Sequence, residues 1–250
     1  MKHRKTKLSL GLKIASILSC VAILSAGFAA WWIVQTPSKL LENGSFTVYT
    51  VTQKEITVTN ASITPATIVF GKPTSTTTST TWLVAKDESG APMATDVLTA
   101  TLTFTVGIKD DTETALNELV DDITITFAPN DATKTNFNTA ITGVKVNDID
   151  KSYIAAPTIT GDGITSVSAY NTTDSNLVVS IPAANTNTMT VTATITFDWG
   201  TLTGGDNPFD YYNTKDYATY SAEALLMLQK VALLKDGGYN ITIGATLPTA

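Results

Sequence analysis

The chain has 250 residues, of which 43% are hydrophobic and only 15% are charged, and this length suffices for one hydrophobic core or two small ones. Its single histidine, His3, and its single cysteine, Cys20, both lie in the first 30 residues. If that segment is removed, the remaining chain has no residues for a Ser-His-Asp triad, a cysteine nucleophile, a His- or Cys-ligated zinc site or a disulfide. Five of the 16 Lys and Arg residues also precede Trp31, which leaves 11 basic and 22 acidic residues beyond it. This acidic balance predicts repulsion from nucleic acid and from anionic lipid.

Residues 1–30 have the pattern of a signal peptide. A basic stretch, residues 1–7, precedes an apolar stretch, residues 8–28. Small residues then form the expected cleavage region, which consists of Gly27, Phe28, Ala29 and Ala30. We therefore expect a signal peptidase to remove this segment and the protein to be secreted.

The same segment also has the properties of an uncleaved membrane anchor. Residues 14–34 are uninterruptedly apolar, and about 20 such residues span a bilayer. Trp31 and Trp32 would then lie at the membrane interface. A lipoprotein with lipidated Cys20 is the weaker alternative, since a polar tether should follow such a cysteine. Contact with a membrane is expected only through this N-terminal segment.

The sequence "KLSLGLKIASILSCVAILSAGFAAWWIVQ" resembles the leader of the TasA/camelysin family of secreted biofilm-matrix fibre proteins. The following "SKLLENGSFTVYTV", residues 38–51, is similar to the stretch that leads into the first strand of that family. Trp31 and Trp32 stand where the family usually has Tyr-Phe or Ala-Phe. The resemblance implies an extracellular fibre subunit that assembles by donor-strand exchange.

The predicted mature N-terminus begins with Trp31, Trp32, Ile33 and Val34. These side chains are too apolar to remain in water, and such a patch usually marks an interaction site. A short strand of this kind can add itself to an open sheet edge or groove of another copy. Pro37 would end it, because proline lacks the N–H that a sheet ladder needs. We predict an assembly segment at residues 31–37; the alternative is that it folds back onto its own domain.

Alternation of apolar residues with threonine predicts strands along the rest of the chain. The segments concerned are residues 46–51, 55–60, 96–107, 122–129, 189–200 and 240–247. Each has one apolar and one polar face, as in antiparallel sheets that pack on a single side. Residues 31–250 are therefore predicted to form a single domain, all-β with minor helices: an antiparallel β-sandwich of jelly-roll type with two helices covering the sheets.

The two helices are predicted at residues 110–122 and 221–238. Ser221 is the expected N-cap of the second helix, and Gly237 with Gly238 is expected to end it. Its leucines occupy most of its circumference, which predicts burial on more than one side or, alternatively, a subunit interface. Residues 73–81, "PTSTTTSTT", are expected to form a polar loop.

Acidic and aromatic residues are the remaining candidates for a site. The acidic ones are Asp110, Asp111, Asp148, Asp150, Asp198, Asp206, Asp210 and Asp216. Carboxylates could hold calcium, but the EF-hand loop pattern is absent and solvated loops are the expected alternative. The aromatic ones are Phe197, Trp199, Phe209, Tyr211 and Tyr212, which could stack on a sugar or close one end of the core.

Camelysin-type proteins have been described as casein-cleaving metalloproteases, but the chain has no His-Glu-x-x-His motif. We therefore predict no catalytic residue, no metal site, no cofactor and no enzymatic activity. The predicted function is a secreted, cell-surface-associated structural subunit of extracellular fibres or biofilm matrix, a homopolymer that grows head-to-tail by donating its N-terminal strand. The alternative is a membrane-anchored cell-surface module, with carbohydrate as one candidate ligand.

Overall fold

The computed structural model describes residues 54–74, 82–86, 89–235 and 237–248. The predicted signal peptide, the cleavage region at residues 27–30, the assembly segment at residues 31–37 and the predicted strand at residues 46–51 lie outside the described residues. From Ile56 onward the chain forms one compact unit.

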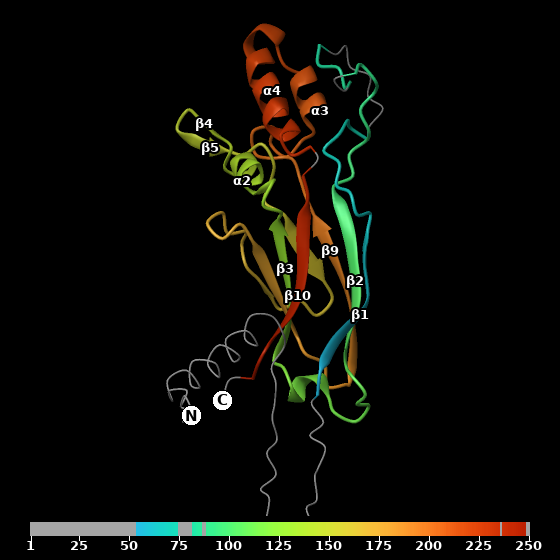
Figure 1. Ribbon diagram of the computed structural model, residues 1–250. Helices are drawn as coiled ribbons and strands as arrows, with labels where there is room; N and C mark the ends of the chain where they lie inside the picture. Colours follow the sequence, from blue (N-terminus) through green and yellow to red (C-terminus); the bar gives the residue numbers. More distant parts are fainter. Residues whose placement is uncertain (1–53, 75–81, 87–88, 236, 249–250) are drawn as a thin grey trace, which may run out of the picture. The chain divides into compact units, whose positions relative to one another are not determined.

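Two four-stranded antiparallel sheets form the body of this unit (Figure 1). The first sheet has the order β1 (Ile56–Thr64), β2 (Thr99–Ile108), β9 (Thr188–Thr196) and β6 (Thr158–Gly161). The second has the order β10 (Tyr239–Thr246), β3 (Asp122–Pro129), β8 (Leu177–Pro182) and β7 (Ser166–Val167). A separate hairpin pairs β4 (Val144–Val146) with β5 (Ile149–Lys151). The predicted all-β sandwich with minor helices is confirmed.

The alternation in the sequence places one face of each central strand in the core. On β3, Ile123, Ile125 and Phe127 are buried, whereas the threonines between them are less buried. The inner residues of β2 and β9 are buried in the same way and join the same hydrophobic cluster. Burial of such side chains is the main favourable term in folding, at about 1.5–3 kcal/mol for each large one. The five strand predictions that fall on described residues therefore hold because a period of two matches the pleat.

The helices gather at one end of the sandwich (Figure 1). They are α2 (Lys134–Thr142), α3 (Pro208–Asn213) and α4 (Tyr217–Ala232). A single 3₁₀ turn, η1 (Leu116–Glu118), lies at the opposite end. We refer below to the α4 end and the η1 end of the domain. The sequence did not predict α2 or α3.

The prediction of a helix over residues 110–122 is wrong, because only η1 is helical within it. The N–H of Leu116 donates to the carbonyl of Thr186 at 2.8 Å, a partner far away in the sequence. The Leu116 side chain is fully buried. This segment therefore serves as a plug at the η1 end, and long-range hydrogen bonds replace the helical ones that its composition suggested.

The strongest predicted helix exists as α4, but it begins earlier than expected. Its N-cap is Asp216, whose carboxylate accepts hydrogen bonds from the Thr219 N–H at 3.1 Å and from the Thr219 hydroxyl at 3.0 Å. Ser221 lies inside the helix and is not its cap. The helix ends at Ala232, a few residues before the expected stop at Gly237.

The expectation that α4 is buried on more than one side is also wrong. Only Ala224, Met227 and Val231 are buried. Two leucines of the helix and the leucine at its C-cap are exposed: Leu225 by 57%, Leu226 by 39% and Leu233 by 51%. The helix thus packs with one narrow stripe of small and flexible side chains and leaves an apolar face outside.

Candidate functional site

The two edges of the sandwich differ in how they are protected. At one edge, β6 and β7 are only four and two residues long, and residues 162–165 connect them from one sheet to the other. At the other edge, β1 has nine residues and β10 has eight, and they come from opposite ends of the described chain. Short strands and covering connections are the usual protection of sheet edges. Within the described residues, the edge formed by β1 and β10 has neither.

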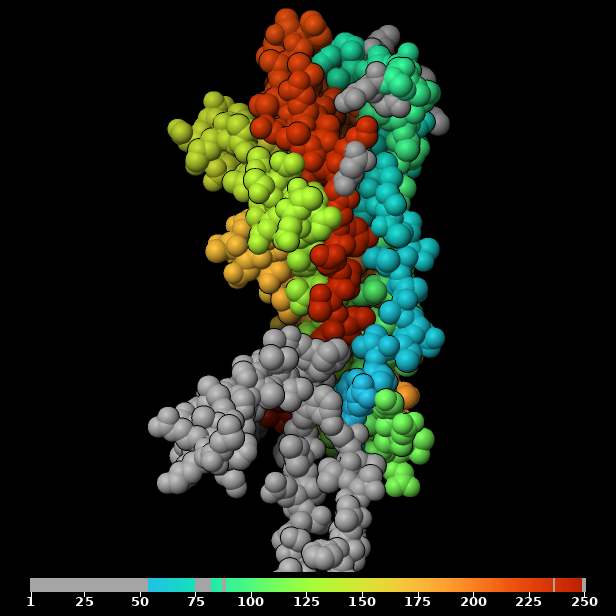
Figure 2. All heavy atoms as spheres, in the orientation of Figure 1, coloured from blue at the N-terminus to red at the C-terminus, as the bar shows by residue number. Residues whose placement is uncertain are grey.

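An apolar groove runs between β1 and β10 (Figure 2). Its volume is about 560 Å³. The side chains that line it come from β1, the following segment, β10 and the α4 end: Ala61, Ser62, Ile63, Ala66, Thr67, Ile68, Phe70, Leu102, Pro129, Thr133, Phe137, Phe197, Leu234, Gly237, Gly238, Tyr239, Ile241 and Ile243. Apart from the Tyr239 phenol, no ionisable side chain is among them.

Side chains that should be core residues are left partly exposed at this edge. Ile241 and Ile243 of β10 and Ile63 of β1 are only partly buried, although all three belong to the inner faces. The corresponding Ile125 of β3 and Ile195 of β9 are fully buried. The difference arises because nothing in the described chain fills the space between the two edge strands. Covering these side chains would add stability at roughly 25 cal/mol per Å².

The backbone of β10 offers a ladder for a further strand. Its eight residues pair with β3 in continuous register, from Tyr239 opposite Pro129 to Thr246 opposite Asp122. Since β10 is the terminal strand of its sheet, its other side has no strand partner within the described residues. Eight residues span about 26 Å at 3.3 Å each, and the seven residues 31–37 would span about 23 Å when extended. The predicted assembly segment therefore has the right length for this edge.

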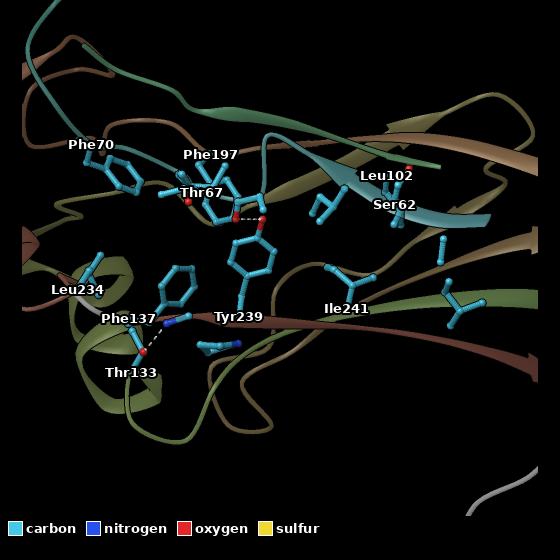
Figure 3. A pocket seen from close by; sticks show the side chains of 18 residues that line it. Ser62, Thr67, Phe70, Leu102, Thr133, Phe137, Phe197, Leu234, Tyr239 and Ile241 are labelled. Carbon is cyan, nitrogen blue, oxygen red and sulfur yellow. Dashed lines mark hydrogen bonds between the residues drawn. The ribbon is translucent and has the colours of Figure 1, made fainter. Parts of the chain in front are cut away.

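Tyr239 crosses the groove near its α4 end (Figure 3). Its hydroxyl donates to the carbonyl oxygen of Ala66 at 3.4 Å. Its ring lies against the rings of Phe127 and Phe197, with centroids 5.5 and 5.9 Å away. Burial raises the pKa of the Tyr239 phenol, so the hydroxyl is protonated and can donate at neutral pH. This long hydrogen bond is a weak tie between the two walls of the groove.

The α4 end of the groove is closed by close packing around α2. The Gly238 N–H donates to the Thr133 hydroxyl at 3.0 Å. A Cβ at Gly237 would approach the Thr133 side chain to 2.5 Å, so a glycine is needed there for the chain to pass. Phe137 of α2 and Leu234 complete this end of the groove.

The acidic candidates do not converge. Asp216 caps α4, and Asp150 forms an exposed ion pair with Lys145 at 3.1 Å. Among the described residues, no group of three or more His, Cys, Asp or Glu side chains is placed to hold a metal ion. The described residues therefore offer no support for calcium, which the sequence left only as an alternative to solvated loop carboxylates.

One carboxylate with a structural role is Asp96, which the sequence did not single out. It accepts hydrogen bonds from the Gly71 N–H at 2.6 Å, the Trp199 indole N–H at 3.0 Å and the Asn207 amide at 2.6 Å. It thereby ties the segment after β1 to the chain after β9 and to the start of α3. The signal that could have revealed it is a lone aspartate immediately before an apolar strand.

The aromatic cluster lies inside the domain. Phe197, Trp199, Phe209 and Tyr212 are buried, and Tyr211 is partly exposed with the Lys215 ammonium 4.5 Å from its ring centroid. Buried rings are not free to stack on a sugar. The cluster closes the α4 end of the core, which is the second of the two roles that the sequence suggested for these aromatic residues.

Among the residues that the structure describes, no helix is long and apolar enough to cross a membrane; the segment considered as an anchor lies outside them. No protein-family model matches the chain, and neither the curated proteins nor the solved structures gave a match.

Proposed function

We propose that this chain is a secreted structural subunit of extracellular fibres or biofilm matrix. After a signal peptidase releases it, each copy inserts Trp31, Trp32, Ile33 and Val34 into the groove of the next copy. The observation that supports this most directly is the apolar groove between β1 and β10, where two long edge strands leave inner-face side chains partly exposed. The resemblance of the leader to TasA/camelysin proteins points to the same class of assembly.

The proposed contact would allow copies of the chain to add one after another into a filament. The donor segment and the groove are different surfaces of the same chain, so the proposed contact is head-to-tail, and it extends into a filament when the rotation between copies does not close a ring. Main-chain hydrogen bonds to the side of β10 that has no strand partner in the described part of the chain would give affinity, and the apolar groove would receive alternate side chains.

The energetics favour a strand that carries tryptophan. Each tryptophan buries roughly 150–250 Å², so two of them supply on the order of 8–12 kcal/mol at 25 cal/mol per Å². Association itself costs about 4–15 kcal/mol. The tryptophans therefore roughly offset that cost, and Ile33, Val34 and the covered groove side chains provide the surplus. Replacing the tryptophans should accordingly abolish assembly rather than weaken it slightly.

The lining of the groove also bears on chemistry. Among the described residues that line it, the one ionisable side chain is the Tyr239 phenol, which favours an apolar strand over a charged substrate. A general acid or base near neutral pH would need a group of a different kind. The proposed role therefore includes no catalysis and no cofactor.

Deletion of residues 31–35 from the secreted form tests the proposal. We expect the parent protein to form filaments, seen by electron microscopy and light scattering, and the shortened protein to remain folded and monomeric. Equal polymerisation by the shortened protein would show that the donated strand lies elsewhere. Unfolding of the shortened protein would show that the segment belongs to its own core.

A second function has one observation in its favour. A volume of about 560 Å³ lies within the range of small-molecule sites, which suits a membrane-anchored surface module that binds an apolar ligand. Mass spectrometry separates the two candidates. The fibre subunit should be recovered from the medium with an N-terminus between Phe28 and Trp32, whereas the anchored module should be recovered from membranes at full length.

A further inference from the structure

We propose that the groove between β1 and β10 selects the direction of the strand that it receives. A tryptophan of the donated strand occupies the α4 end of the groove and a β-branched side chain follows toward the η1 end, so the strand runs parallel to β10. This inference rests on the proposed function and deepens it, because it assigns the side chains of the acceptor that set the direction of the donor.

The aromatic side chains of the groove are confined to one half of it. The described residues that line the groove include four aromatic ones, and all lie toward the α4 end (Figure 3): Phe70, Phe137, Phe197 and Tyr239. The Phe197 ring stands edge-on to the rings of Phe70 and Phe137, with centroids 6.4 and 6.5 Å away. The centroid of the Tyr239 ring lies 5.9 Å from that of Phe197. We call these four side chains the aromatic end of the groove.

The other half of the groove is aliphatic. Toward the η1 end, the larger side chains of the lining are Ile63, Leu102, Ile241 and Ile243. Ile63 and Leu102 lie side by side on paired strands, and the two isoleucines of β10 follow Tyr239 at every second position. Residues two apart in a strand point to the same face. From the α4 end to the η1 end, the order along β10 is therefore aromatic and then aliphatic.

The α4 end of the groove is also its closed end. There the Gly238 N–H donates to the Thr133 hydroxyl, and the Tyr239 hydroxyl donates to the Ala66 carbonyl across the groove. At the other end, no residue of η1 belongs to the lining that the described residues form. A chain cannot continue past the closed end without disrupting these hydrogen bonds, so a strand that terminates there fits better than one that continues. The predicted N-terminus of the secreted chain provides such a terminus.

The donated segment has the same order of side chains as the groove. Every second residue of a strand faces the same way, so the inward face of residues 31–34 carries one tryptophan followed by Ile33 or Val34. A strand parallel to β10 places this indole at the aromatic end, where edge-to-face ring contacts add to the effect of the buried apolar area. It also places the β-branched side chain in the aliphatic half. The opposite direction places the indole among aliphatic side chains and brings no ring to the aromatic end.

The main chain does not select the direction by itself. Parallel and antiparallel ladders both provide main-chain hydrogen bonds to a strand edge. β10 pairs with β3 without interruption, whereas the pairing of β1 with β2 shifts between Thr59 and Ser62. The longer regular ladder is thus that of β10, and the side chains decide in which direction the donor lies against it.

Disulfide trapping in filaments of the secreted protein tests the direction, because residues 31–250 contain no cysteine. One variant combines Gln35→Cys with Ser62→Cys, and the other combines Gln35→Cys with Thr67→Cys. Ser62 lines the aliphatic half of the groove, and Thr67 lines it beside the aromatic end (Figure 3). With a tryptophan at the aromatic end, Gln35 lies three or four residues further toward η1. We expect the Ser62→Cys variant to give disulfide-linked multimers on non-reducing gels and the Thr67→Cys variant to remain monomeric there.

A donor with reversed order tests the same inference without a change of composition. The reversed donor carries Trp31→Ile, Trp32→Val, Ile33→Trp and Val34→Trp, and its control carries only Ile33→Val and Val34→Ile. We expect the reversed donor to raise the critical concentration for assembly, measured by sedimentation, by about tenfold, and the control to stay within about twofold of the parent. Phe70→Leu should raise the critical concentration of the parent but hardly that of the reversed donor, because both changes remove the same contact. Urea unfolding of each unassembled subunit checks that it remains folded.

Two results would overturn the inference and leave the proposed function intact. One is a set of multimers that forms through Thr67→Cys and not through Ser62→Cys. The other is a reversed donor that assembles at the parent's critical concentration while deletion of residues 31–35 still abolishes filaments. Filaments in which neither cysteine pair forms would show that the donated strand does not lie in the groove, which removes the proposed function as well. A parent protein that forms no filaments would remove both in the same way.

Discussion

Replacement of Ile241 and Ile243 by threonine should weaken fibre assembly far more than it weakens the fold. Both side chains line the groove and are only partly buried. Threonine keeps the β-branched shape that suits a strand, so β10 should retain its pairing with β3. Each substitution removes about two buried carbon groups, at roughly 0.8 kcal/mol each when fully covered.

The expected loss divides between two states. If both side chains were fully covered, the two substitutions would remove about 3 kcal/mol of apolar burial energy. Because both side chains are already partly buried in the unassembled subunit, about half of this loss lowers the stability of the subunit itself. The remainder appears only when a donor strand covers the groove, together with roughly 1–3 kcal/mol for hydroxyls shielded from water. We therefore expect the unfolding free energy of the subunit to fall by about 1–2 kcal/mol and the critical concentration for assembly to rise by about 100-fold.

Urea unfolding of the unassembled subunit and sedimentation of the assembled form measure the two quantities separately. A matched control changes Asn240 and Thr242 to serine, because both are exposed residues of the same strand; it should leave the critical concentration within about twofold of the parent. If the threonine variant loses stability but assembles at the parent's critical concentration, no donor strand covers β10 and the groove reasoning is refuted.

Three other predictions concern the fold and the chemistry. Asp216→Ala should lower the unfolding free energy by about 1 kcal/mol, measured in urea, because it removes the N-cap of α4; an unchanged midpoint would show that the cap is dispensable. Asp96→Ala should cost about 2–4 kcal/mol, since three donors lose a charged acceptor, whereas Asp96→Asn should cost less; tryptophan fluorescence can follow the transition through Trp199, and an equal loss in both variants would contradict this account. The purified secreted protein should leave casein intact with or without zinc, and chelator-sensitive cleavage by a homogeneous preparation would disprove the absence of enzymatic activity.

The sequence by itself predicted the long, strictly alternating strands. Strict alternation, as in β2, β3 and β9, is a local property, and burial of one face follows directly from the pleat. The sequence also shows that residues 31–250 contain no histidine and no cysteine, so sites that depend on these residues were not expected there. Short strands such as β6 and β7 were missed because two to four residues carry too little periodicity to detect.

Helix boundaries depended on partners that lie far away in the chain. The composition of residues 110–122 favours a helix, but the Leu116 N–H donates to the carbonyl of Thr186 and the Leu116 side chain is buried at the end of the core. α4 was correctly expected, yet its leucine content predicted deeper burial than the domain provides. Local propensity could not show how much surface the sandwich would offer to that helix.

The groove itself is a product of tertiary structure alone. β10 and the first residues of β1 alternate like the central strands, and this alternation does not show that the two strands would be terminal. Their edge positions follow from the pairing of β1 with β2 and of β10 with β3, which joins segments far apart in the chain. Long-range pairing therefore decided which apolar side chains remain partly exposed, while the sequence supplied a segment, residues 31–37, with the length and chemistry proposed to cover them.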